Sequence, residues 1–242
     1  GPPAVPRKDD PMITMLLLPG MDGTSELFER FIATAPPGFR FFPVRLPEKS
    51  SYDELETALI GNLPDGSFTI VAESFSGPLG IRLAARAAHR VQSLIFSNSF
   101  TRAPRSPLYM AFPWSTLFRV LPPKWVIRAY LLGRFTNAEN MRAVRKAAAQ
   151  MSPRIIAGRV RESLRVDDLA VVRNLALPIL YLRGREDRLV PDRSVEEMQR
   201  ANPAVVRRDL DAPHLLLQTV PEEAWSHIEA FIMTATRKGG NS

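Results

Sequence analysis

Three residues of this chain, Ser74, Asp187 and His214, have side chains that can serve together as nucleophile, supporting acid and general base. A serine hydroxyl becomes a nucleophile when an imidazole accepts its proton, and a carboxylate behind the imidazole orients the ring and stabilises the imidazolium. The chain has no cysteine, which excludes disulfides, thiolate metal sites and cysteine nucleophiles. We therefore expect serine-based acyl-transfer chemistry, with no metal and no cofactor.

The segment around Ser74 is typical of a nucleophile held on a sharp turn. The run Phe68–Ala72 is β-branched and aromatic, as in a buried strand, and a helical pattern of apolar residues follows over 76–89. A strand that turns abruptly into a helix needs small neighbours, and Ala72 and Gly77 are small. Such a turn strains the serine backbone and presents the side chain beside a helix N-terminus. From this segment alone, a buried strand followed by a serine-capped helix is the alternative.

Only three histidines are available as the base. His89 ends the predicted helix after Ser74, where the helix dipole favours a cationic side chain. His227 lies inside the last predicted helix, in a packing or surface position. His214 follows Asp211-Ala212-Pro213 in a loop between the last predicted strand and the last helix. We therefore predict His214 as the base, with a surface loop histidine as the alternative.

The carboxylate that orients the base is predicted to be Asp187. It lies in the turn Gly184–Pro191, just after a predicted strand. Glu186 is expected to point elsewhere, Asp192 to cap a helix, and Asp211 is close to the base in sequence. Asp211 or Glu186 would replace Asp187 if that assignment failed. The chain order is then nucleophile, acid, base, unlike either unrelated order of serine proteases.

A tetrahedral oxyanion needs two backbone donors, and the sequence offers two candidates. One is the amide of Phe75, directly after the nucleophile, and the other is the amide of Met21. Met21 lies in the loop Pro19–Thr24, whose glycines permit a close approach; a plain glycine turn is the alternative. We expect Asp22 to brace this loop and Glu73 to be buried in a hydrogen-bonded role.

The rest of the chain alternates strand-like and helix-like segments, which predicts an α/β fold with a mostly parallel sheet flanked by helices. The expected strands are 13–19, 39–44, 68–72, 91–97, 178–183 and 204–210. The expected helices begin at Thr24 or Ser25, span 53–63 and 76–89, run from Asp192 or Ser194 to Arg200, and span 221–234. Since sites lie at the carboxyl ends of parallel strands, the candidate residues should gather at one edge of the sheet.

A proline-broken helical segment over 102–173 interrupts this alternation and is expected to form an inserted lid. Residues 12–101 and 174–236 then make up the core domain. The lid aromatics Phe112, Trp114 and Phe118 are candidates to line an acyl pocket, or they pack a small helical subdomain onto the core.

The lid segment also holds the positive charge of the chain. It has 14 Lys and Arg against 4 Asp and Glu, a balance of +10, within a total net charge of +7. This excess predicts an anionic partner, an acidic carrier protein or a coenzyme A ester, or else a solvated face. Nucleic acid fits poorly, because no binding motif is present and aromatic residues do not alternate with the basic ones.

Apolar residues make up 45% of the 242 residues and charged residues 24%, as in ordinary globular proteins. No apolar run approaches the ~20 residues of a membrane-spanning helix. The N-terminus lacks the apolar segment of a signal peptide, and Gly1-Pro2 resembles a protease-cleavage remnant. We expect a cytoplasmic protein.

Four motifs in this order resemble the α/β-hydrolase superfamily. They are Leu18–Gly23 for the oxyanion loop, Ala72–Gly77 for the nucleophile elbow, Gly184–Pro191 for the acid turn, and His214. The family's usual His-Gly is Pro19-Gly20 here, and Ala72 and Ser76 replace the outer glycines of the elbow.

The resemblance implies hydrolysis of carboxylic esters through an acyl-enzyme. The layout is similar to small bacterial carboxylesterases with basic lids, such as esterases of pimeloyl-carrier-protein methyl ester. A thioesterase or C–C bond hydrolase with the same triad is the alternative enzyme, and a ligand-binding receptor of this fold is the alternative outside catalysis.

Overall fold

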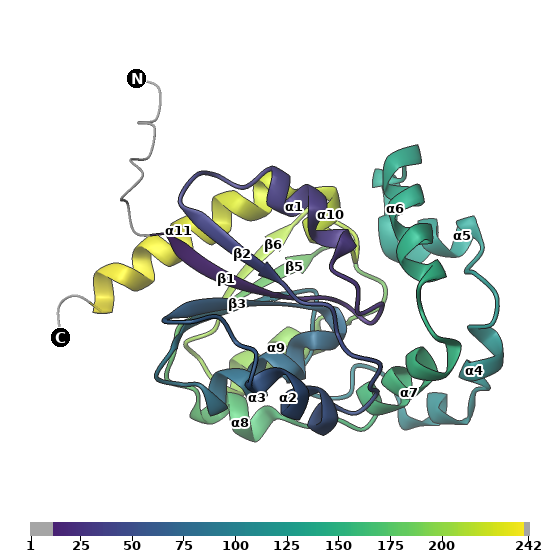
Figure 1. Cartoon of the computed structure of the whole chain (residues 1–242), viewed down its shortest axis with the longest axis horizontal. Coiled ribbons are helices and arrows are strands. Elements are labelled where there is room, and N and C mark those ends of the chain that lie inside the picture. The colour runs from purple at the N-terminus through teal and green to yellow at the C-terminus, as the bar shows by residue number, and fades with distance from the viewer. Residues whose placement is uncertain (1–11, 240–242) are drawn as a thin grey trace.

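The structure, a computed structural model, describes residues 12–239 and contains one sheet of six parallel strands (Figure 1). In spatial order β2-β1-β3-β4-β5-β6, the strands are Phe39–Pro43, Ile13–Leu18, Phe68–Glu73, Val91–Ser97, Ile179–Gly184 and Val206–Leu210. The central β3 is buried along its whole length, because parallel strands are covered on both faces and are therefore apolar throughout. The predicted parallel sheet is confirmed.

Helices cover the two faces of the sheet and form two separate cores (Figure 1). One face packs against α2 (Tyr52–Ile60), α3 (Gly77–Arg86), α8 (Leu169–Asn174) and α9 (Arg193–Ala201). The other packs against α1 (Glu29–Ala33), α10 (Leu216–Thr219) and α11 (Pro221–Gly239). Alternation along β3 divides the strand between the cores, with Ile70 in the first and Val71 in the second.

The strand register places the candidate residues at one edge of the sheet. Leu18 of β1 lies opposite Ala72 of β3, and Ser97 of β4 lies opposite Glu73 on one side and Leu182 on the other. The loops that follow β1, β3, β4 and β5 therefore start at the same edge, as expected for a site at the carboxyl ends of parallel strands.

A helical insertion lies between β4 and β5, beyond this edge (Figure 1). Its α-helices are α4 (Trp114–Leu117), α5 (Lys124–Ile127), α6 (Ala138–Ala149) and α7 (Pro153–Ser163). An antiparallel bridge between Arg102 and Asp167 joins the two ends of the insertion. Helix α8 follows it and packs against α3 and α9, in the helical layer of the core.

One local prediction about a helix end is wrong, and two are right in position but not in bonding. Helix α3 ends at Arg86, so His89 lies in the exposed turn beyond it and does not end the helix. Ser25 occupies the N-cap position of the helical turn Glu26–Phe28, which leads into α1, but its side chain makes no capping bond, and Thr24 bonds to Asp22. Asp192 occupies the N-cap position of α9 as predicted, but its carboxylate forms ion pairs with Arg183 and Arg207 and makes no capping bond.

None of the helices within residues 12–239 is long and apolar enough to cross a membrane. The N-terminal residues, for which the sequence predicts no signal peptide, lie outside the described part of the chain.

Candidate active site

The turn after β3 holds Ser74 in the left-handed region, with φ at 48°. A short 3-10 turn over Ser74–Ser76 leads directly into α3. The close approach of the next loop explains why Gly77 must be small: a Cβ there would lie 2.1 Å from Ser99 Oγ and 2.5 Å from the Phe100 carbonyl oxygen. A non-glycine residue with positive φ is strained, and here it is the residue proposed as nucleophile.

The structure brings Ser74, His214 and Asp187 into one line. Ser74 Oγ is 2.9 Å from His214 Nε2, and His214 Nδ1 is 3.0 Å from each carboxylate oxygen of Asp187. The side chains of His214 and Asp187 are only 5% and 2% exposed. Because Nδ1 faces two acceptors it carries the proton, which leaves Nε2 free to accept the serine proton.

Backbone amides hold the acid in place. Asp187 Oδ1 accepts hydrogen bonds from the amides of Leu189 at 2.8 Å and Val190 at 3.2 Å. The competing carboxylates have other partners: Glu186 pairs with Arg134, and Asp211 pairs with Arg185. Of the acidic residues considered from the sequence, Asp187 alone bonds to the histidine.

The electrostatics of the pair favour a more basic imidazole. Burial lowers the pKa of His214, but the charge and the hydrogen bond of Asp187 raise it, with a further contribution from the charge of Glu73. The net pKa of His214 therefore lies above its ordinary value. A base of raised pKa accepts the serine proton more readily.

Asn98, at the end of β4, joins the acid turn to the base loop. Its side-chain amide donates to the carbonyl oxygens of Pro213 and His214 at 2.9 and 2.8 Å, and its oxygen accepts from the Gly184 amide at 2.7 Å. The segments are so close that a Cβ on Gly184 would lie 2.5 Å from the Ala212 carbonyl oxygen. Asn98 has a φ of 43° and was not singled out in the sequence.

The predicted oxyanion loop lies against the elbow. The Ser76 hydroxyl donates a hydrogen bond to the Pro19 carbonyl oxygen, so two of the three positions that depart from the family pattern are bonded to each other. Asp22 braces the loop as expected, because it accepts from the Thr24 amide at 2.9 Å and from its hydroxyl at 2.6 Å. Within residues 12–239 the Met21 amide has no hydrogen-bond partner, so it is available as a donor.

Arg159 of α7 connects the insertion to this loop by hydrogen bonds. Its guanidinium donates to the carbonyl oxygens of Met21, Pro47 and Lys49 at 3.0, 2.9 and 3.1 Å, and the residue is only 3% exposed. It also lies 5.8 Å from the ring centre of Phe75, the residue after the serine. Burial lowers the pKa of Arg159, and the negative charge of Asp22 raises it in part. The arginine stays charged at neutral pH.

The second predicted oxyanion donor, Phe75, is fixed from the other side. Tyr52 of α2 donates a hydrogen bond from its hydroxyl to the Phe75 carbonyl oxygen at 2.8 Å. The two rings also stack with their centres 4.8 Å apart. The peptide that follows Ser74 is therefore held by contacts from the core and from the insertion.

Glu73 is buried directly before Ser74, as expected, and is 2% exposed. It accepts a hydrogen bond from Gln218 Nε2 at 3.1 Å, while its Oε1 has no partner among the described residues. Burial raises the pKa of Glu73 to about 7, helped by the charge of Asp22 and opposed by Gln218 and His214.

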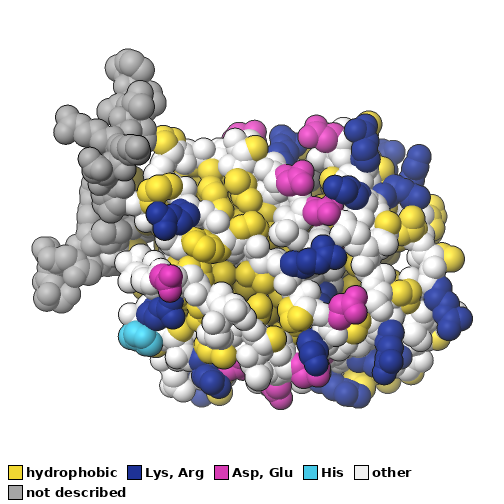
Figure 2. All heavy atoms as spheres, in the orientation of Figure 1, with side chains coloured by type: hydrophobic (Ala, Val, Ile, Leu, Met, Phe, Trp, Pro, Cys, Tyr) yellow, Lys and Arg dark blue, Asp and Glu magenta, His cyan; other side chains and the backbone are white. Residues whose placement is uncertain are grey.

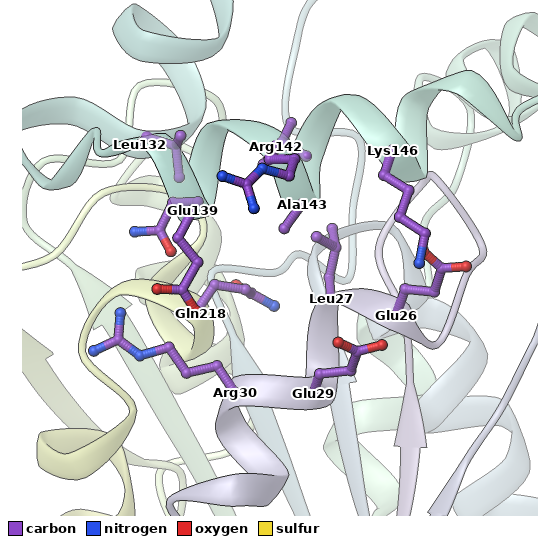
Figure 3. A pocket seen from close by; sticks show the side chains of 12 residues that line it. Glu26, Leu27, Glu29, Arg30, Leu132, Glu139, Arg142, Ala143, Lys146 and Gln218 are labelled. Carbon is purple, nitrogen blue, oxygen red and sulfur yellow. The ribbon is translucent and has the colours of Figure 1, made fainter.

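Gln218 also lines a pocket of ≈ 230 Å³ between α6 of the insertion and α1 (Figure 3). Figure 3 shows Glu139 and Arg142 on the α6 side, and Arg30 and Glu29 on the α1 side. The Gln218 side chain therefore connects this pocket to Glu73 through its hydrogen bond.

The lid aromatics form a stack of their own. Ring centres are 5.5 Å apart for Phe112 and Trp114 and 6.0 Å apart for Trp114 and Phe118. Phe112 is 53% exposed, and within the described residues no ring contact or hydrogen bond joins these three side chains to the triad.

Sequence reasoning missed Asn98, Arg159 and Gln218. The only signal for Asn98 was a polar residue directly after a buried strand, at the edge where sites form. Arg159 looked like one of many lid arginines, and Gln218 lay in an apolar run before the last helix. Their hydrogen-bond partners are 86 or more residues away in sequence, so no local pattern identifies them.

No protein-family model and no curated protein sequence matches this chain, but solved structures do. The enol-lactonase from Burkholderia xenovorans LB400 superposes with a TM-score of 0.80 at 16% identity, over 94% of either chain. An esterase from Thermogutta terrifontis has a TM-score of 0.77 at 19% identity, over 92% of this chain and 90% of that one. MenH from S. aureus has a TM-score of 0.77 at 14% identity, over 93% and 94%. Likeness at such low identity establishes architecture alone, and that architecture, which the motifs predicted, is the α/β-hydrolase fold.

Proposed function

We propose that this protein hydrolyses carboxylic esters through an acyl-enzyme intermediate on Ser74. The observation that carries the proposal is the continuous line of hydrogen bonds from Ser74 through His214 to Asp187, at 2.9 and 3.0 Å. A hydroxyl, an imidazole and a carboxylate at such distances are the arrangement by which histidine activates a serine as general base. The strained backbone of Ser74, with φ at 48°, supports the same role.

In the acylation step, Ser74 Oγ attacks the carbonyl carbon while His214 Nε2 takes the hydroxyl proton and Asp187 stabilises the imidazolium. The backbone amides of Met21 and Phe75 would donate to the oxyanion, and loss of one such donor typically costs ~3 kcal/mol of barrier. The tetrahedral intermediate then expels the alcohol, which receives the proton from His214. Water, deprotonated by His214, attacks the acyl carbon; the second tetrahedral intermediate collapses, His214 returns the proton to Ser74 Oγ, and the carboxylic acid leaves.

Esters of small or medium acyl chains are the substrate class that we propose. Two of the similar structures carry the names enol-lactonase and esterase, and both names denote cleavage of a carboxylic ester. A thioesterase or C–C bond hydrolase would use the same triad, so competition among an ester, a thioester and a diketone substrate decides between them. Contact of Phe112, Trp114 and Phe118 with the acyl chain and docking of an anionic carrier on the lid remain predictions.

The proposal is tested by labelling with a fluorophosphonate, which reacts covalently with activated serines, followed by mass spectrometry of the modified peptide. We expect the label on Ser74 in the wild type and in a Ser226→Ala control, whose serine is exposed on α11, and no label in Ser74→Ala. Hydrolysis of aryl esters should follow the same pattern. A folded wild type that neither takes the label nor hydrolyses any ester would overturn the proposal in favour of a ligand-binding receptor.

A further inference from the structure

The outer side of the insertion carries a concentration of exposed apolar side chains. Of the eleven large apolar side chains exposed within residues 12–239, eight lie between positions 108 and 130. We call these eight residues the lid edge: Leu108, Tyr109, Phe112, Leu117, Val120, Leu121, Trp125 and Tyr130. The exposed fraction reaches 82% for Leu108 and 69% for Trp125. Single exposed apolar residues are ordinary, but a gathered set marks an interaction surface.

Two members of the lid edge are in direct contact with each other, and all eight come from one continuous stretch of the insertion. Tyr109 and Phe112 stack with ring centres 5.8 Å apart, and the stack continues through Trp114. Helices α4 and α5 follow one side of the molecule, farthest from the sheet (Figure 1). Figure 2 shows apolar and basic side chains intermixed along this convex side, while acidic side chains appear nearer the middle of the view.

The charge of the lid edge has one sign. No Asp or Glu occurs between Glu73 and Glu139 in the sequence. Arg119, Lys124 and Arg128 are exposed among the apolar side chains, and none of them pairs with a carboxylate in the described part of the chain. These cations are therefore available to an anionic partner.

We propose that the lid edge binds the surface of an anionic lipid membrane. Exposed leucine, tryptophan and tyrosine side chains enter the boundary between headgroups and acyl chains, and lysine and arginine pair with anionic headgroups. A folded acidic protein could pair with the cations of the lid edge. It would also need an apolar hollow on its own surface to receive the lid-edge side chains, because these project from a convex side of the molecule. The inference concerns binding only and does not depend on the proposed ester hydrolysis.

The test is cosedimentation of the full-length protein with vesicles of phosphatidylcholine alone or mixed with phosphatidylglycerol. The Ser74→Ala background prevents hydrolysis of the lipid, so binding is measured apart from activity. We expect binding to the anionic vesicles, little binding to phosphatidylcholine, and a loss of binding as salt screens the charges. Replacing Leu108 and Trp125 with serine should weaken binding about tenfold or more, as should reversing Arg119, Lys124 and Arg128 to glutamate.

Two control variants change side chains of the same kinds outside the lid edge. Met233→Ser removes an exposed apolar side chain from α11, and glutamate at Arg40, Arg200 and Arg208 reverses three exposed cations of the core. Both controls should bind like the parent. Absence of binding to anionic vesicles, or an equal loss in the core variants, would overturn the proposal. The proposal would also be overturned if this protein bound a purified acyl carrier protein through the lid edge and did not bind vesicles.

Discussion

The side-chain amide of Asn98 donates a hydrogen bond of 2.8 Å to the backbone carbonyl oxygen of His214, 116 residues further along the chain. The same side chain accepts from Gly184, the first residue of the acid turn. One buried asparagine therefore sets the position of the proposed base relative to the proposed acid. Because it touches neither the serine nor a substrate, Asn98 acts through the position of other groups.

Asn98→Asp should lower kcat/KM by about 10–100-fold, because small misplacements of catalytic groups carry costs of that size. The carboxylate still accepts from the Gly184 amide but cannot donate to the two carbonyl oxygens, and it places a negative charge beside them. We also expect a loss of about 2–4 kcal/mol in the free energy of unfolding, from buried acceptors left without donors. Ester kinetics and thermal unfolding measure the two effects.

The chain offers a matched control in Asn202. This buried side chain also donates to two backbone carbonyl oxygens, those of Val172 and Leu175, and accepts from the Ala204 amide. Asn202→Asp should destabilise the fold to a similar degree while the folded protein keeps its kcat/KM. Equal losses of kcat/KM in both variants would show that Asn98 has a structural role only.

Asp187→Asn should reduce kcat by about 10⁴-fold with the fold intact, because an amide no longer holds the imidazole in the productive tautomer. Glu186→Gln and Asp211→Asn should each leave kcat within a few-fold of wild type, since Arg134 and Arg185 are their partners. Steady-state ester hydrolysis measures kcat for each variant, and circular dichroism checks that the variant is folded. A near-normal rate in Asp187→Asn would assign the acid to Asp211 or Glu186.

Arg159→Met should lower kcat by about 10–100-fold, because the oxyanion loop loses the donor that holds the Met21 carbonyl oxygen. We expect KM to change less than kcat, since the oxyanion forms after substrate has bound. Arg154→Met is the control: it removes an exposed arginine from the same helix, α7. If Arg159→Met changed only KM, the arginine would act on the substrate and not on the loop.

The pH dependence of kcat/KM should report both His214 and Glu73. His214 must be neutral to accept the serine proton, and its pKa is raised, so activity should fall as pH drops through a value above about 6.5. Glu73, with a pKa of about 7, titrates in the same range, so the apparent values belong to the pair. Glu73→Gln removes a negative charge that favours the imidazolium and should move the acid limb to lower pH, by up to about one unit.

Stability gives an independent measure of the same carboxyl. Because the pKa of Glu73 is higher in the folded state than in the unfolded state, binding of a proton to this carboxyl stabilises the fold. This contribution to stability is fully present below about pH 4 and is lost as pH rises through about 7. Wild type should therefore lose stability relative to Glu73→Gln between pH 5 and pH 8, as measured by Tm at each pH. Glu223→Gln, an exposed carboxyl on α11, should show no such trend.

The sequence by itself determined the parallel sheet, the insertion after β4 and the choice of Ser74, Asp187 and His214 as candidates. These inferences depend on local signals: apolar runs of strand length, small residues around a turn, and chemistry-bearing residues directly after predicted strands. The two histidines that were set aside lie in local contexts that already argued against them.

Only the tertiary structure decided what holds these candidates together. Asn98 reaches Gly184 and His214, Arg159 reaches Met21 and Lys49, and Gln218 reaches Glu73, each across at least 86 residues. Local rules placed Asp192 correctly at the start of α9, but only the tertiary structure pairs its carboxylate with Arg183 and Arg207. A buried polar side chain forms hydrogen bonds with whichever groups folding brings near it. Which groups those are depends on packing over the whole chain.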